Sequence, residues 1–141
     1  AQLFTSLFRI RKIHKTYLAI VYGKVDKSLN VMKDDLIYYE NNKKVFQKAV
    51  SNLKIIKSHE NYSFLELNPI TGRKHQLRKQ LLKIGCPIIG DNKYFLNDRK
   101  RIKIKNLMLH AYKIKFMINN VQYNFKANYH NLFENFLKKN F

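Results

Sequence analysis

The sequence contains few residues that make linkers, disulfides or acidic sites: two prolines, four glycines, one cysteine and nine acidic residues in 141. Cys86, as the only cysteine, excludes an intrachain disulfide and a thiolate metal site, and we expect a reducing, cytoplasmic location. No internal repeat or linker divides the chain, whose length suits one domain. No apolar run approaches the roughly 20 residues that cross a bilayer, so we expect no membrane span.

Acidic residues are outnumbered by 28 lysines and arginines, which gives a formal net charge of +19. Such a chain repels itself unless a polyanion lies nearby, and nucleic acid is the natural partner. The alternative is that a nucleotide bias in the coding genome inflates lysine and asparagine, here 22 and 16 residues. Only six positive charges are arginines. Because arginine is suited to forked, planar recognition, each arginine is more informative than each lysine.

Hydrophobic periodicity predicts an α+β fold, a mixed and mostly antiparallel sheet with flanking helices. Asparagine-containing turns at 60–61 and 119–120 indicate two hairpins. Between 24 and 51 the signals are weak, and we expect loops with one short strand. The predicted strands are 15–23, 52–59, 62–69, 107–118 and 121–127, and the predicted helices are 2–12, 71–84 and 131–141.

The predicted helix 71–84 carries two polar groups beside its buried stripe. Thr71 is an acceptable N-cap, and its neighbours at the helix start would attract anions. Arg78 and His75 lie on one flank, where the guanidinium could face a carboxylate or phosphate. The alternative is an ordinary amphipathic helix with solvated basic side chains. Five scattered histidines without acidic partners predict no metal site. The buried stripe consists of Leu77, Leu81 and Ile84.

The longest recognisable pattern covers residues 67–94, which read LNPITGRKHQLRKQLLKIGCPIIGDNKY. It resembles the signature of the RluA-type pseudouridine synthases, in which Pro-x-Thr-Gly-Arg-x-His-Gln-Leu/Ile-Arg leads into Gly-x-Pro-Ile-x-Gly-Asp-x-x-Tyr. Residues 15–23 resemble the family's Lys-x-Tyr-x-Ala-x-Val-x-Gly strand, and 107–116 its Leu-His-Ala strand. Two positions depart from the pattern: Gln80 replaces a usual histidine, and Asn128 replaces the proline of an Ala-Pro pair.

The resemblance implies an enzyme that isomerises uridine to pseudouridine within RNA, with no cofactor and with an essential aspartate. Its members flip the base, break the N1–C1′ bond, turn the uracil and rejoin it through C5. Tyr17 would stack on the flipped uracil, or else be a core aromatic. Arg78 would pair with the catalytic aspartate. The residues expected to line the pocket or meet RNA are Arg73, Lys74, His75 and Gln76; Gly85, Pro87, Gly90 and Asp91 would shape the following turn.

The catalytic aspartate itself is missing from the pattern. The family carries it in an Arg-Leu-Asp-x-x-Thr-Ser-Gly type run upstream of the Lys-x-Tyr strand, and nothing before Lys15 resembles that run. We therefore expect 1–141 to be the C-terminal portion of a catalytic domain, inactive alone, with the upstream part removed, on another chain or absent. The expected substrate is large-subunit ribosomal RNA, with transfer RNA next. The alternative function is a non-catalytic basic RNA-binding protein or decayed synthase.

Overall fold

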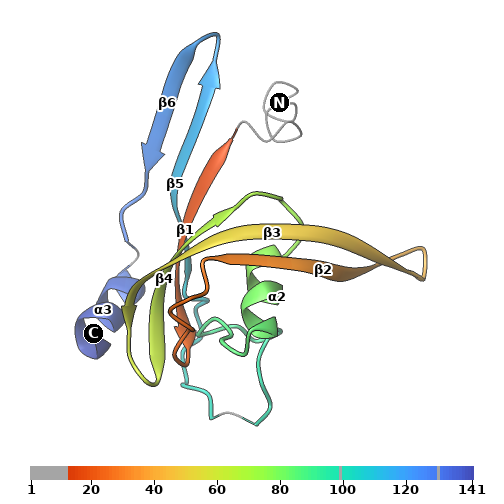
Figure 1. Ribbon diagram of the computed structural model, residues 1–141. Helices are drawn as coiled ribbons and strands as arrows, with labels where there is room; N and C mark the ends of the chain where they lie inside the picture. Colours follow the sequence, from red (N-terminus) through yellow and green to blue (C-terminus); the bar gives the residue numbers. More distant parts are fainter. Residues whose placement is uncertain (1–12, 99, 130) are drawn as a thin grey trace.

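The computed structural model describes residues 13–98, 100–129 and 131–141 (Figure 1). The predicted helix 2–12 lies outside these residues. The α+β prediction is confirmed. The elements are β1 (His14–Tyr22), β2 (Val31–Glu40), β3 (Lys43–Ser58), β4 (Tyr62–Pro69), α2 (Gln76–Lys83), β5 (Leu109–Ile118), β6 (Val121–Lys126) and α3 (Asn131–Asn140).

The described strands form one six-stranded sheet in the order β2-β3-β4-β1-β5-β6. Every neighbouring pair is antiparallel. The hairpins β2–β3 and β5–β6 extend beyond the body of the molecule in different directions (Figure 1). The predicted turn at Asn119 and Asn120 is confirmed, with φ of 49° and 63°, values that a two-residue hairpin turn requires. The strand β1 lies inside the sheet, where its side chains are held from both sides.

The expectation for residues 24–51 was wrong. Two long strands, β2 and β3, occupy most of this segment, and they meet at Asn41 and Asn42 with φ of 49° and 64°. Much of this hairpin is exposed, including Tyr39 and Phe46 at 73% and 60%. Because neither face is steadily buried, the sequence lacks the alternation of apolar and polar residues by which a strand is recognised. Cross-strand pairing, rather than burial, defines this part of the sheet.

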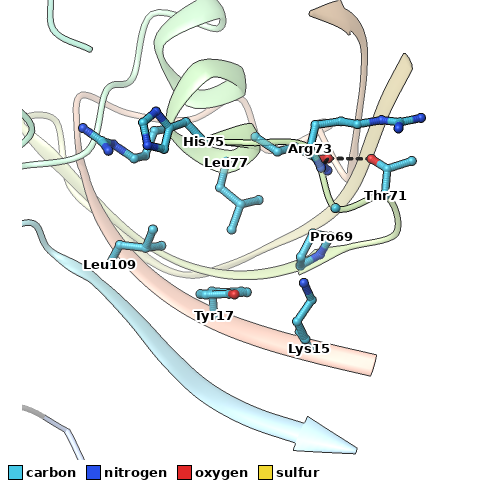
Figure 2. A pocket seen from close by; sticks show the side chains of 11 residues that line it. Lys15, Tyr17, Pro69, Thr71, Arg73, His75, Leu77 and Leu109 are labelled. Carbon is cyan, nitrogen blue, oxygen red and sulfur yellow. Dashed lines mark hydrogen bonds between the residues drawn. The ribbon is translucent and has the colours of Figure 1, made fainter. Parts of the chain in front are cut away.

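The two helices among the described residues cover opposite faces of the sheet. On β4, the Phe64 ring packs against Phe133 of α3, with ring centroids 5.9 Å apart. Leu67 pairs with Tyr17 of β1 and, three residues from Phe64, points to the other face. Leu77 of α2 lies above that Tyr17 ring (Figure 2). The face under α2 therefore contains both the predicted strand tyrosine and the predicted helix residues.

Helix α2 begins later than the sequence predicts. Its N-cap is His75, in the left-handed conformation with φ of 54°, and it runs for eight residues. Thr71 is not the cap, because its hydroxyl donates to Gln76 Oε1 at 2.6 Å and accepts from the Val50 N–H at 2.9 Å. The threonine thus fastens the preceding loop to β3. The hydrogen bond with Val50 on β3 thus uses the Thr71 hydroxyl, which the local sequence pattern assigns to capping the helix.

Gln80, which departs from the family pattern, ties α2 to the neighbouring hairpin. Its side chain is fully buried. The amide nitrogen donates to the Met32 carbonyl at 3.1 Å, and the amide oxygen accepts from the Ser51 hydroxyl at 2.6 Å. Gln80 therefore makes a buried and satisfied polar contact between the helix, β2 and β3.

Gly90 allows two segments to approach closely after α2. Its φ is +85°, and a Cβ there would lie 1.9 Å from the Asn106 carbonyl oxygen. Gly90→Ala is expected to lower the free energy of unfolding by about 1–3 kcal/mol, because the two backbones must separate. Gly85→Ala is the matched control, since Gly85 has φ of +82° but open space around it. Urea unfolding of both variants should show the larger loss at Gly90; equal losses would contradict the close-approach explanation.

Candidate active site

A cavity of about 210 Å³ lies between β1, β5 and α2. It is smaller than the roughly 300–1,000 Å³ of pockets that hold drug-sized ligands, which suits a single planar ring. The Tyr17 ring lies beneath Leu77, with Leu109 to one side and Lys15 and Pro69 to the other (Figure 2). The remaining lining residues are Thr71, Gly72, Arg73, His75, Gln76 and Arg78. Five of the six residues predicted for the site thus line one cavity, and Lys74 does not.

Tyr17 is placed by an irregularity of the sheet. It pairs with Leu67 on β4 and Ala111 on β5, and the register with β5 shifts between Thr16 and Tyr17. Such bulges redirect a side chain from the regular alternation. Burial raises the pKa of the Tyr17 phenol, so its hydroxyl stays protonated at neutral pH. The cavity is therefore bordered by a neutral aromatic ring on which a base can stack.

Arg78 makes a two-pronged ion pair with Asp91. Its Nε donates to Oδ2 at 2.8 Å, and Nη2 donates to Oδ1 at 2.7 Å. The Asp91 side chain has no exposed surface, and that of Arg78 is 18% exposed. The turn after α2 returns Asp91 to the helix, so this arginine has an acidic partner within the chain; its pairing with the catalytic aspartate stays a prediction. Bidentate pairing fixes the plane of the guanidinium as well as its position.

Asp91 is a positioning group and is not available as a base. Besides Arg78, Oδ1 accepts from the N–H groups of Lys93 and Tyr94, so the predicted turn-shaping role is confirmed. Burial acts to raise the pKa of Asp91, but the bonds from Arg78 and the two N–H groups outweigh it and leave the pKa below its usual value. The carboxylate is thus ionised and occupied. All nine carboxylates lie in the described residues, and none of them lines the 210 Å³ cavity.

His75 and Tyr94 complete the wall around Arg78. The His75 Nδ1 and the Tyr94 hydroxyl are 2.9 Å apart, and the Arg78 guanidinium carbon lies 4.8 Å from the Tyr94 ring centroid. Burial, followed by the positive charges of Arg78 and nearby lysines, lowers the pKa of His75, so the imidazole is neutral at neutral pH. Tyr94 received no role from the sequence, although it ends the family pattern. The structure places it between the histidine and the arginine.

Gln76 lines the cavity but has no free amide group. Its nitrogen donates to the Val50 carbonyl and the Ser51 hydroxyl, and its oxygen accepts from Thr71 and from the Arg73 N–H. All the hydrogen-bonding capacity of the side chain is used inside the protein. Of the two predicted roles, lining the pocket and meeting the RNA backbone, the geometry favours the first.

Arg73 and Lys74 face outward. The Arg73 Nε donates to the Lys48 carbonyl at 2.9 Å, and its guanidinium points away from the Tyr17 ring (Figure 2). Lys74 is exposed, and its carbonyl accepts from the Tyr38 hydroxyl. A contact of either cation with RNA stays a prediction.

The profile of the RNA pseudouridylate synthase family matches residues 1–83, more than half of the chain. These residues include the strand that carries Tyr17 and the helix that carries Arg78. This chain belongs to the RluA-type pseudouridine synthase family. As in the sequence prediction, the pattern around residues 67–94 indicated the family correctly.

Individual synthases are similar over most of this chain. A ribosomal large subunit pseudouridine synthase C of Rickettsia bellii is 40% identical over 119 residues, 76% of this chain and 38% of that protein. A tRNA pseudouridine synthase C of Haemophilus ducreyi is 34% identical over 138 residues, 82% of this chain and 57% of that protein. The chain therefore spans about two fifths to three fifths of these relatives.

A solved structure, human RNA pseudouridylate synthase domain containing 4, has a similar fold. The TM-score is 0.80 at 25% identity, over 98% of this chain and 66% of that one. That solved structure thus shares the fold of this chain. Neither a cluster of metal-binding side chains nor a helix able to cross a membrane is found in the described part of this chain.

Proposed function

We propose that this chain holds a flipped uridine of RNA in the 210 Å³ cavity and takes part in its isomerisation to pseudouridine. The observation that carries the proposal is the joint placement of Tyr17 and the Asp91-held Arg78 along one small cavity in a family of RNA pseudouridylate synthases. A flipped base needs an aromatic platform and a fixed polar edge, and these two side chains supply them.

In the proposed reaction the protein orients the uridine, and none of the protein's own groups is consumed. The N1–C1′ bond breaks, the uracil turns, a C5–C1′ bond forms, and C5 loses a proton while N1 gains one, so no cofactor is required. Tyr17 would stack on the uracil both before and after it turns. Arg78 still has N–H groups beyond the two bound to Asp91, and these would face the reacting base or a second carboxylate.

We further propose that residues 1–141 form one domain and that the essential aspartate is supplied by a segment carrying the Arg-Leu-Asp run. The support is that no carboxylate of the chain lines the cavity. For substrate we favour large-subunit ribosomal RNA, named for the Rickettsia bellii relative, over transfer RNA, named for the Haemophilus ducreyi relative. A cytoplasmic location agrees with such substrates.

The experiment uses this chain joined to an N-terminal segment that carries the family's Arg-Leu-Asp run. Tyr17→Ala should slow pseudouridine formation about 10- to 100-fold, because base stacking contributes about 1–3 kcal/mol. Tyr17→Phe, which keeps the aromatic face, should retain most of the rate. Mass spectrometry of chemically labelled pseudouridine in a ribosomal RNA fragment measures both. An unchanged rate in Tyr17→Ala would contradict the stacking role.

The second candidate is a non-catalytic RNA-binding protein, favoured by the absence of a carboxylate from the cavity lining. It predicts that the joined chain binds RNA with the salt sensitivity of lysine–phosphate contacts but forms no pseudouridine. Pseudouridine formed by the joined chain, and lost when its added aspartate becomes asparagine, would exclude this candidate.

A further inference from the structure

A row of cations follows the turn after α2, outside the proposed uridine cavity. Arg101, Lys103 and Lys105 are exposed, and they alternate with Ile102 and Ile104, which are partly buried against the main core. We call the three cations the basic ridge. The alternation indicates that the isoleucines anchor the segment and that the cations are presented together to solvent.

The backbone of this segment is held at several points. The Ile102 N–H donates to the Tyr22 hydroxyl at 2.9 Å, and the Ile104 N–H donates to the Ile102 carbonyl at 2.9 Å. Just beyond the ridge, Asn106 packs so closely on Gly90 that no Cβ fits between them. These contacts fix the ridge relative to the sheet, so a ligand does not have to order a loose loop on binding.

The ridge borders an open cavity of about 700 Å³. The carboxylate that lines it, Asp91, has no exposed side-chain surface and is paired with Arg78. No unpaired negative charge therefore faces the ridge from the described lining. The Arg101 guanidinium lies 3.8 Å from the Phe95 ring centroid, which limits its orientations. The other lining residues are Tyr22, Gly90, Asn92, Ile102 and Ile104.

The ridge and the uridine cavity are neighbours through one ion pair. Arg78 lines the smaller cavity, and its partner Asp91 lines the larger one. The two cavities therefore lie on either side of this ion pair, and the ridge is the basic surface of the second cavity. Successive ridge cations are at most about 7 Å apart along the chain, which is of the order of the spacing between consecutive phosphates of a strand.

We propose that the basic ridge of Arg101, Lys103 and Lys105 binds the sugar-phosphate backbone of the substrate RNA next to the flipped nucleotide. This inference rests on the proposed function and adds a place where the RNA strand is held. Phosphate contacts of this kind give affinity and register without reading sequence. The ridge should therefore affect the binding of any uridine-containing strand rather than the choice of base.

The test measures binding of the full chain to a uridine-rich single-stranded RNA oligonucleotide across a salt series. The ridge variant combines Arg101→Gln, Lys103→Gln and Lys105→Gln. The control combines Lys24→Gln, Lys27→Gln and Lys54→Gln, which removes the same charge from exposed lysines that line neither cavity. Circular dichroism and thermal unfolding check that both variants are folded.

The ridge variant should bind about tenfold more weakly, and the slope of log affinity against log salt should shallow by about 2, near 0.7 for each lost phosphate contact. The control should show a smaller change in slope. Equal changes in both variants would overturn the ridge while leaving the proposed function in place. A parent chain that binds no RNA would overturn both.

Two further arms separate RNA from other polyanions. Vesicles containing anionic phospholipid and a polyglutamate competitor replace the RNA. The RNA assignment would be overturned if the ridge variant lost vesicle binding but kept RNA binding. It would also be overturned if polyglutamate displaced RNA from the parent chain as effectively as unlabelled RNA does. We expect the parent chain and the control variant to bind RNA in preference to vesicles and polyglutamate, and the ridge variant to lose this preference.

Discussion

Arg78→Lys, in the chain joined to an aspartate-bearing segment, is expected to slow pseudouridine formation by about 10²–10³-fold, the effect of losing one preorganised donor at a reacting group. Two guanidinium nitrogens are occupied by Asp91, which holds the fork, and Arg78 lines the cavity where its remaining N–H groups are proposed to meet the base. A lysine ammonium has the charge but cannot pair with both carboxylate oxygens and keep a planar edge for the base. Single-turnover rates on a ribosomal RNA fragment measure the loss.

The matched control for this prediction is Lys83→Ala, on the same helix. Lys83 is 57% exposed in its side chain and pairs with Asp34 at 3.3 Å, away from the cavity lining. Its removal should leave the single-turnover rate near that of the parent. RNA affinity should persist in Arg78→Lys, because the total charge is unchanged. A rate in Arg78→Lys equal to the parent's would refute a role for the guanidinium fork.

Asp91→Ala is expected to lower the free energy of unfolding by about 3 kcal/mol, the lower end of the roughly 3–5 kcal/mol that breaking a buried ion pair costs. The lower end applies because Arg78 is 18% exposed and water can partly solvate it. Asp91→Asn should lose less, since its side-chain oxygen still accepts from the Lys93 and Tyr94 N–H groups. Urea unfolding measures both, and equal stability of all three proteins would contradict the structural role of the pair.

The contribution of Asp91 should also depend on pH. Its pKa in the folded protein lies below the ordinary value of about 3.9, because the bonds from Arg78 and two backbone N–H groups outweigh burial. The stabilisation is fully present above the unfolded pKa and is lost as pH falls towards and through the folded pKa. The stability difference between the parent and Asp91→Asn should therefore be constant from pH 5 to 7 and shrink below about pH 4. A difference that does not shrink on acidification would contradict this linkage.

Local sequence patterns were reliable where burial alternates or a turn has a strong preference. The strand containing Tyr17 and the Asn119–Asn120 turn were both predicted, because each depends on residues close in sequence. The β2–β3 hairpin was missed because its exposed faces remove the alternation. The turn at Asn41 and Asn42 resembles the one at 119–120 and was the signal that could have located it.

The functional site was likewise determined in part by the sequence and in part by the tertiary structure. The pattern over residues 67–94 indicated the family and selected Arg78, and the strand pattern over 15–23 selected Tyr17; both residues line one cavity. The acidic partner of Arg78 and the true start of α2 were decided only by the tertiary structure. Asp91 lies 13 residues further along the chain, beyond any helical spacing, and Thr71 found its partner on β3. The Arg78–Asp91 pair and the start of α2 both depend on which distant segments are buried against each other, and the local periodicity of the sequence does not determine those contacts.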